Sequence, residues 1–136
     1  MDTNEILSAT ATLGRSHYHT ELTARRHVLI GDEPVEIGGT DDGPRPGDFI
    51  RMGLASCTAI TLRMYADRKQ WNVERIVVKV SNGPFADKTR YQTDIEIAGQ
   101  LSQEQKERLM QIAQKCPVHK TLINPIEIET SLTVKS

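Results

Sequence analysis

The chain has 136 residues, and its 17 Lys and Arg against 18 Asp and Glu give a net charge of −1. This length is typical of one domain, so we expect residues 1–136 to form a single domain. The charge balance lacks the basic excess of nucleic-acid-binding domains, and the composition is not that of a disordered chain. We therefore expect a globular protein without a nucleic-acid partner.

The sequence shows no sign of a targeting or membrane segment. Residues 1–5 (MDTNE) are acidic and polar, whereas a secretory signal begins with basic residues and continues with an apolar stretch. The longest apolar region, residues 49–65, contains Arg51 and Arg63 and falls short of a membrane span. The sequence therefore predicts a cytoplasmic protein with no membrane partner.

The first third of the chain has the period-two alternation of β-strands. Apolar residues alternate with Ser and Thr up to Gly14, and a turn is expected at Arg25 and Arg26. The pattern predicts three strands, at residues 7–13, 18–24 and 27–30.

A loop and a long helix are expected next. Residues 38–47 (GGTDDGPRPG) have the composition of a loop, and Pro46 and Asp48 both suit a helix N-terminus. The pattern predicts a helix over residues 48–69 that is apolar almost all round, which is typical of a buried helix. One of its faces has the i, i+3, i+4 spacing and contains Ile50, Gly53, Leu54, Cys57, Ile60, Thr61 and Met64.

The rest of the chain predicts two paired strands, a second helix and a last strand. Ser102 and Gln105 match a capping box, and Pro117 should interrupt the helix that follows. That helix places Leu109, Ile112, Ala113 and Cys116 on one apolar face. The strands are expected at residues 76–80, 91–97 and 126–134.

This element order predicts an α+β fold with a mostly antiparallel sheet and two main helices, one of them long and buried. One sheet face covers only one side of a helix that is apolar all round. We therefore expect a second copy of the chain to cover the other side, which makes the protein a homodimer.

Cys57 and Cys116 carry the most informative chemistry. Cytoplasmic cysteines are rarely structural disulfides, and on apolar helical faces they are often inert core residues. Cys57 is flanked by the hydroxyls of Ser56 and Thr58, and Cys116 ends its helix beside Pro117. If both faces point inward the thiols can meet, and an attacking plus a resolving cysteine is the minimum for a cycle through sulfenic acid and disulfide. Inert core thiols stay an alternative.

A metal site is a further alternative. Its ligands would come from Cys116 and His119, spaced C-x-x-H, and from His17 and His19, spaced H-x-H. Structural zinc takes four protein ligands and catalytic zinc three, and the sequence offers no compact cluster of either kind. We expect no metal and no other cofactor. An acyl-transfer nucleophile formed by Cys116 and His119 also stays open.

Two segments resemble the OsmC/Ohr family of osmotically inducible and organic hydroperoxide resistance proteins. Residues 38–58, continued by residues 62–71, resemble the loop and central helix of the family. Residues 113–122 (AQKCPVHKTL) resemble its second-cysteine segment, and the element order matches over nearly the whole chain. The resemblance implies an intertwined homodimer with active sites at the subunit interface. It also implies thiol-dependent reduction of organic hydroperoxides, an antioxidant activity of the stress response.

The resemblance also implies roles for single residues. Cys57 matches the peroxidatic position and Cys116 the resolving one. Family members pair an acidic residue near the start of the central helix with an arginine, and Asp48 stands where a glutamate is usual. For the arginine, Arg15 matches one subgroup, Arg26 is the second candidate and Arg25 stays open.

Thiol chemistry explains why such a site needs a cation. The thiolate is the attacking form, and burial raises the thiol pKa from about 8.5. An arginine is always charged, and a carboxylate such as Asp48 would orient it. Asp48 precedes Cys57 by nine residues, about half a turn out of phase on a helix, so the site should be assembled from several segments.

In the expected cycle, Cys57 reduces the peroxide, Cys116 forms a disulfide with it, and an external dithiol restores both thiols. Apolar side chains would line a pocket for the organic part of the substrate, unless they are core residues: Phe49, Leu54, Ile60 and Met64. Two other functions stay open. One is a non-catalytic dimeric binding module with inert thiols, and the other is an acyl or thioester enzyme that uses a single cysteine.

Overall fold

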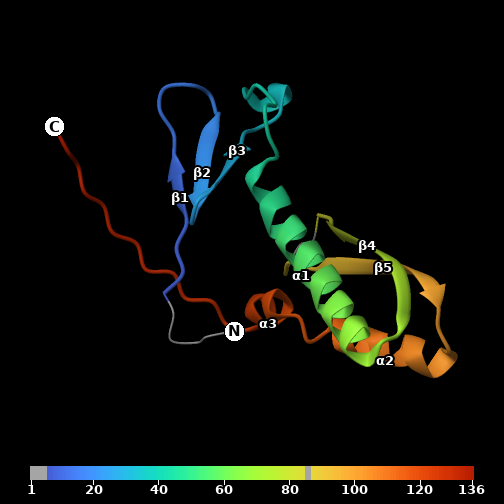
Figure 1. Cartoon of the computed structure of the whole chain (residues 1–136). Helices are drawn as coiled ribbons and strands as arrows, with labels where there is room; N and C mark the ends of the chain where they lie inside the picture. The colour runs from blue at the N-terminus through green and yellow to red at the C-terminus, as the bar shows by residue number, and fades with distance from the viewer. Residues whose placement is uncertain (1–5, 85–86) are drawn as a thin grey trace. The chain divides into compact units, whose positions relative to one another are not determined.

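The computed structural model describes residues 6–84 and 87–136. Residues 1–5, on which the expectation of no secretory signal was based, lie outside this part. The chain folds as two compact units, Met1–Ile50 and Arg51–Ser136, and each is described by itself. Of the helices in the described ranges, none has the length and apolar character needed to cross a membrane. Antiparallel strands and three α-helices confirm the expected α+β class (Figure 1).

The first unit contains a three-stranded antiparallel sheet whose strands lie side by side in chain order. The apolar side chains of Ala11, Leu22 and Leu29 lie at paired positions across the three strands. The predicted turn at Arg25 and Arg26 joins the second strand to the third. All three predicted strands are present: β1 (Thr10–Thr12), β2 (Thr20–Ala24) and β3 (His27–Gly31). The first strand is shorter than expected.

A 3₁₀-helix, η1 (Val35–Ile37), and the predicted loop lead to the long helix α1 (Pro46–Lys69). Pro46 is the first helical residue, where its missing N–H costs nothing. Gln70 follows the helix with a φ of 58°, a left-handed conformation that ends the helical hydrogen bonding.

The second unit combines most of α1 with a hairpin and two more helices. β4 (Asn72–Asn82) pairs antiparallel with β5 (Tyr91–Gln100), and both are longer than predicted. α2 (Gln103–Ala113) begins with the predicted capping box, in which Ser102 and Gln105 exchange hydrogen bonds. α3 (Pro117–Ile123) follows after a short connection.

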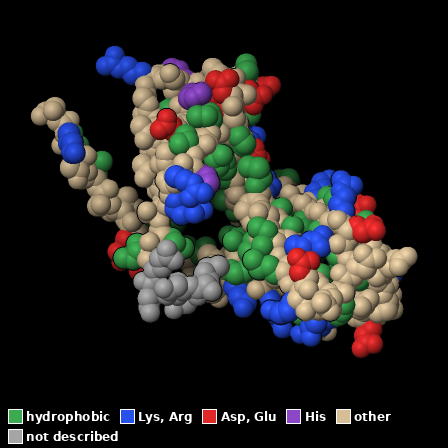
Figure 2. All heavy atoms as spheres, viewed as in Figure 1, with side chains coloured by type: hydrophobic (Ala, Val, Ile, Leu, Met, Phe, Trp, Pro, Cys, Tyr) green, Lys and Arg blue, Asp and Glu red, His purple; other side chains and the backbone are tan. Residues whose placement is uncertain are grey.

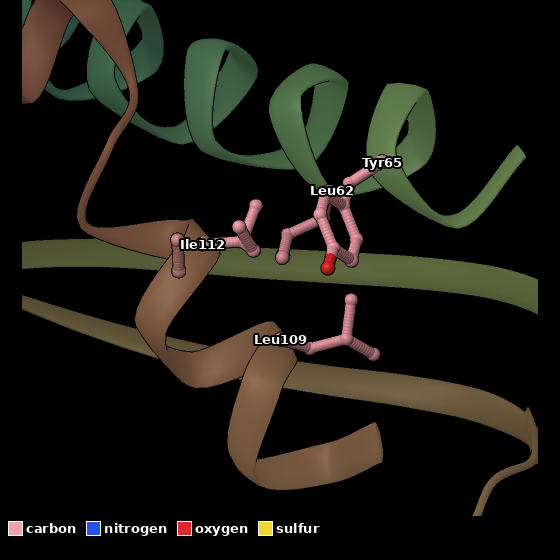
Figure 3. Packing of buried hydrophobic residues seen from close by; sticks show 5 residues of the cluster. Leu62, Tyr65, Leu109 and Ile112 are labelled. Atoms are coloured by element: carbon pink, nitrogen blue, oxygen red, sulfur yellow. The ribbon is translucent and has the colours of Figure 1, made fainter. Parts of the chain in front are cut away.

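The core of the second unit lies between α1 and α2. Leu62 and Tyr65 of α1 point toward Leu109 and Ile112 of α2 (Figure 3). The Arg108 Nε donates a hydrogen bond of 3.0 Å to the Tyr65 hydroxyl at the edge of this cluster. The hairpin and its flanks cover the cluster with Trp71, Ile76, Ile95, Ile97 and Leu101.

The predicted buried face of α1 is only partly buried within one chain. The buried residues of this helix are Leu54, Thr58, Leu62, Tyr65 and Ala66. Ile50, Ile60 and Met64 are instead exposed, with Met64 at 66%. Hydrophobic side chains are visible at the surface of the second unit in Figure 2. The helix is apolar on several sides, but α2 and the hairpin can cover only one of them. Within one chain, α1 is therefore half-buried.

The predicted strand over residues 126–134 is absent from the described chain. This segment is irregular, and Ile128, Leu132 and Val134 are more than 80% exposed. The alternating sequence is correct for a strand, but a strand also needs a neighbour to accept its backbone hydrogen bonds.

The prediction that Cys116 ends the second helix is also wrong. α2 ends at Ala113, and Cys116 is the N-cap of α3 with Pro117 at its first position. Pro117 does not simply interrupt a helix, because its fixed φ suits the start of a new one.

We predict that Gly99→Ala destabilises the hairpin. Gly99 has a φ of +151°, and a Cβ there would lie 2.1 Å from the Asn72 carbonyl oxygen, beside the irregular register at Val73. The free energy of unfolding should fall by about 2 kcal/mol or more, measured by urea denaturation. Gly14→Ala is the control, because a Cβ at Gly14 would contact nothing within 4 Å. Equal stability of the two variants would contradict this account of the hairpin.

Candidate active site

The structure brings the two cysteines together within the second unit. Cys57 lies in the middle of α1 and is half-buried, whereas Cys116 is fully buried at 0% exposure. Both thiols are free, and Cys116 lies close enough to Cys57 to raise the pKa of the Cys57 thiol. The Cys57 thiol is thus partly accessible at the surface, whereas the nearby Cys116 thiol is buried.

The position of Cys116 depends on the start of α3. Its backbone is extended, with φ −61° and ψ 134°, and its Sγ accepts a hydrogen bond of 3.4 Å from the His119 N–H. Its carbonyl accepts another of 3.1 Å from the Lys120 N–H. A sulfur is a weak acceptor, so it occupies a position where Ser or Asp would cap the helix better. Helix stability alone therefore does not explain a cysteine here.

The Cys57 sulfur is surrounded by groups with opposite effects. Burial raises the pKa of the Cys57 thiol above its ordinary value, and the adjacent Cys116 thiol raises it further. The backbone N–H of Val118 and the hydroxyl of Thr61 lower this pKa, because both donate hydrogen bonds to the sulfur. The raising effects are larger, so most of the Cys57 thiol is protonated at neutral pH.

The loop before α1 is organised by Asp32, a residue that the sequence alone did not single out. Asp32 is 2% exposed, and its carboxylate accepts hydrogen bonds from the Thr40 hydroxyl at 2.6 Å and the Glu33 N–H at 2.7 Å. The N–H groups of Tyr18 and Asp42 donate at 3.1 Å and that of Thr40 at 3.4 Å. This carboxylate therefore ties the end of β3 to the Gly-rich loop.

These donors hold the pKa of Asp32 well below its usual range. The Thr40 hydroxyl has the largest effect, and the backbone N–H groups of Glu33, Asp42 and Tyr18 also lower the pKa, against the opposing effect of burial. The loop also needs Gly39, because a Cβ there would lie 2.0 Å from the Glu33 carbonyl oxygen. The sequence did contain a signal for this role of Asp32: an acidic residue directly follows a strand and precedes a Gly-rich loop.

Asp48 caps the start of α1. Its Oδ2 accepts a hydrogen bond of 3.0 Å from the Arg45 N–H, and its own N–H donates to the Arg45 carbonyl at 2.9 Å. Asp48 is the third helical residue, so this carboxylate also lies favourably at the positive end of the helix dipole. The sequence correctly predicted that Asp48 lies at the N-terminus of this helix.

The candidate arginines lie on exposed connections of the first unit. Arg15 is in the connection between β1 and β2, and Arg26 is in the turn between β2 and β3. Arg15, Arg26 and Asp48 belong to the first unit, and the cysteines belong to the second. The structure thus places the two cysteines near each other. The pairing of Cys57 with an arginine stays a prediction.

The four apolar residues expected to line one substrate pocket do not do so within this chain. Ile60 and Met64 are exposed on α1. Leu54 lines a cavity of about 420 Å³ in the second unit, together with His119 and Leu122. Phe49 lines a different cavity, of about 570 Å³, in the first unit.

The metal alternatives that the sequence left open are not assembled. Among the described residues, the group with metal-ligand spacing is His19, Asp32 and Asp42, which includes neither cysteine nor His119. The His19 Nδ1 lies 3.1 Å from the Asp42 Oδ2, and the Asp32 oxygens already accept hydrogen bonds from the protein. This cluster is fully explained by its role in holding the loop.

Comparisons with known proteins decide the family. A family model described as OsmC-like protein matches residues 39–131, more than half of the chain. The chain belongs to the OsmC-like family. The matched region begins in the loop that Asp32 holds and includes both cysteines, so the resemblance identified from the sequence is confirmed.

Relatives and solved structures agree with this assignment. An uncharacterized protein of Mycobacterium tuberculosis is 28% identical over 119 residues, which cover 80% of this chain and 82% of the relative. The OsmC-like protein of Mycoplasma pneumoniae has the same fold, with a TM-score of 0.75 and 21% identity over 88% of this chain and 89% of that one.

Two proteins with organic hydroperoxide resistance in their descriptions also share the OsmC-like fold. The protein from Legionella pneumophila has a TM-score of 0.59 and 22% identity, with 90% of this chain and 92% of that chain covered. The protein OhrB of Bacillus subtilis has a TM-score of 0.57 and 18% identity, with 89% and 93% covered.

We predict that Asp32→Asn destabilises the first unit of this OsmC-like protein. An amide offers one acceptor oxygen in place of two, so it leaves donors of the loop unpaired. The thermal midpoint at pH 7, followed by circular dichroism, should fall by about 5 °C or more. Asp41→Asn is the matched control, because Asp41 is exposed and its φ of 54° suits asparagine.

The effect of Asp32→Asn on stability should depend on pH. The folded-state pKa of Asp32 is lowered, so its stabilising effect is complete above the unfolded-state value of about 3.9 and is lost as the pH falls below that value. The difference in midpoint between the native protein and Asp32→Asn should therefore shrink below about pH 4. A difference that grows on acidification would contradict the ionised state of Asp32.

Proposed function

We propose that this protein is a thiol-dependent peroxidase that reduces organic hydroperoxides. The observation that carries the proposal is the proximity of a half-buried thiol, Cys57, to a fully buried thiol, Cys116. An inert core cysteine needs neither surface access nor a second thiol beside it. The organic hydroperoxide resistance proteins that share the fold support the choice of substrate class.

The exposure of the two thiols supports the following order of steps. The Cys57 thiolate attacks one peroxide oxygen, so that an S–O bond forms and the O–O bond breaks. The leaving alkoxide takes a proton and departs as the alcohol, and Cys57 becomes a sulfenic acid. The Cys116 thiol then attacks this sulfur, and water leaves as the disulfide forms. An external dithiol reduces the disulfide and becomes a disulfide itself.

The first unit supplies further parts of the proposed site. We assign Asp48 the task of orienting an arginine toward Cys57, in addition to capping α1, with Arg15 as the first candidate and Arg26 as the second. The cation is needed because burial raises the pKa of the Cys57 thiol. The arginine comes from this chain or from a second copy of it.

The protein is further proposed to act as a homodimer in the reducing cytoplasm. Exposed apolar residues on α1, among them Ile60 and Met64, would be covered by a second copy. Residues 126–134 would find in that copy the neighbouring strand that one chain does not offer. A reducing compartment suits two adjacent cysteines that are both free.

Two other functions can be separated from this one by experiment. A non-catalytic binding module would leave both thiols unreactive toward peroxide. A single-cysteine acyl or thioester enzyme would not need the second cysteine. The proximity of the two thiols favours the peroxidase over both alternatives, since neither alternative requires two neighbouring thiols.

We predict that both cysteines are needed for turnover, with different defects. With cumene hydroperoxide and a dithiol, Cys57→Ser should consume peroxide only at the background rate. Cys116→Ser should also lose turnover but still form one sulfenic acid, detected with a sulfenic-selective probe.

Peptide mapping provides the outcome that tests this cycle most directly. One equivalent of hydroperoxide should produce an intrachain disulfide between Cys57 and Cys116 that a dithiol readily reduces. Multiple turnovers by Cys57→Ser, or a bond between different chains only, would refute the proposed mechanism. Turnover by Cys116→Ser would favour the single-cysteine alternative.

We predict that the protein sediments as a dimer at micromolar concentration, and that Ile60→Asp shifts it toward a folded monomer. Ile60 is 50% exposed in the single chain, so a charge there costs little in the monomer but much in an apolar interface. Gln103→Asp is the control, because it adds the same charge at the exposed start of α2, where negative charge is favourable. A native protein that sediments as a stable monomer would rule out the homodimer.

A further inference from the structure

A cavity of about 350 Å³ in the second unit is bordered by β5 and α2. Its most buried lining residues are Leu62 of α1 and Leu109 of α2, which are 1% and 3% exposed. Ile95, Ile97 and Leu101 are partly buried and line it as well. The volume falls at the lower end of the range of about 300–1,000 Å³ that is typical of small-molecule sites, whose walls are also mostly apolar.

Among the described residues that line this cavity, Lys106 is the one with a charged side chain. Lys106, Leu109 and Met110 have the i, i+3, i+4 spacing, so they share one face of α2. Lys106 and Met110 are exposed, Met110 at 62%, whereas Leu109 is buried. The ammonium group and the methionine therefore lie at the mouth of the cavity, and the leucine lies inside it.

The acidic side chains of the same two elements lie away from this cavity. Glu104 and Glu107 of α2 line a different cavity. Asp94 and Glu96 alternate along β5 with the apolar residues that line this one, so they project from the opposite face of the hairpin. In the described part of the chain, no acidic side chain forms an ion pair with Lys106. An apolar cavity thus has a positive charge at its mouth that the described chain does not neutralise.

We propose that this cavity binds a small organic acid, with an unbranched apolar chain between β5 and α2 and a carboxylate paired with Lys106. The apolar walls favour a hydrocarbon chain, because binding removes apolar surface of both from water. The single ammonium group favours one negative charge at the end of that chain. Met110 can adapt to the chain, because its side chain is unbranched and flexible.

This binding site is separate from the cysteine pair. Leu62 follows Cys57 by five residues on α1, a spacing that places the two side chains about 140° apart around the helix. The bound acid would therefore contact a different side of α1 from the one on which the Cys57 thiol lies. Binding requires neither thiol, so it does not depend on the peroxidase function.

Calorimetric titration of the full chain with octanoate measures this binding, with acetate and 1-octanol as matched ligands. The native protein should bind octanoate about tenfold or more tightly than acetate, which lacks the chain, and than 1-octanol, which lacks the charge. Lys106→Gln should weaken octanoate binding by about fivefold or more, and Lys106→Arg should retain it. Lys115→Gln is the control, because it removes the same charge at an exposed position outside the cavity lining.

Reversal of the charge at the mouth gives the sharpest outcome. Lys106→Glu should lose octanoate binding and bind octylamine, whereas the native protein should prefer octanoate. Equal octanoate affinity in Lys106→Gln and Lys115→Gln would overturn the proposal, as would 1-octanol that binds the native protein as tightly as octanoate. Octanoate that converts a sedimenting dimer to monomer would also overturn it, because the cavity would then belong to the contact between two copies.

Discussion

The packing of α1 against α2 is the contact on which the cysteine pair depends. Leu62 and Tyr65 interlock with Leu109 and Ile112 (Figure 3), and all four lie 8% exposed or less. Buried side chains of this size each contribute about 1.5–3 kcal/mol through the loss of apolar surface from water. This contact fixes the end of α2, and the short connection after it places Cys116 beside α1.

The two thiols occupy this junction in different ways. Cys57 extends from the middle of a rigid helix and reaches the surface, whereas Cys116 is held at the start of α3 by the backbone of His119. Burial and the second thiol oppose ionisation of Cys57, while two donors favour it. The balance of these effects, rather than a single activating group, sets the reactivity of the sulfur within the second unit. The arginine and Asp48 of the proposed site would add to this balance from the first unit.

Three features of the fold are incomplete in a single chain. One side of α1 exposes Ile60 and Met64, and the C-terminal segment exposes alternating apolar residues without a neighbouring strand. The two-stranded sheet formed by β4 and β5 also has few strands for independent stability. A second copy of the chain would cover the exposed apolar residues and supply neighbouring strands, so the proposed dimer explains all three features together.

Local patterns in the sequence determined the elements of this protein. The capping box at Ser102 and Gln105, the start of α1 at Pro46 and the hairpin strands each depend on neighbouring residues, so they could be predicted directly. The motifs around Cys57 and Cys116 likewise identified the family. Only the tertiary structure decided which side of α1 is buried, because that depends on what packs against an almost uniformly apolar helix. It also assigned Cys116 to α3 and Asp32 to the centre of the loop, since hydrogen bonds between residues distant in sequence leave no periodic pattern.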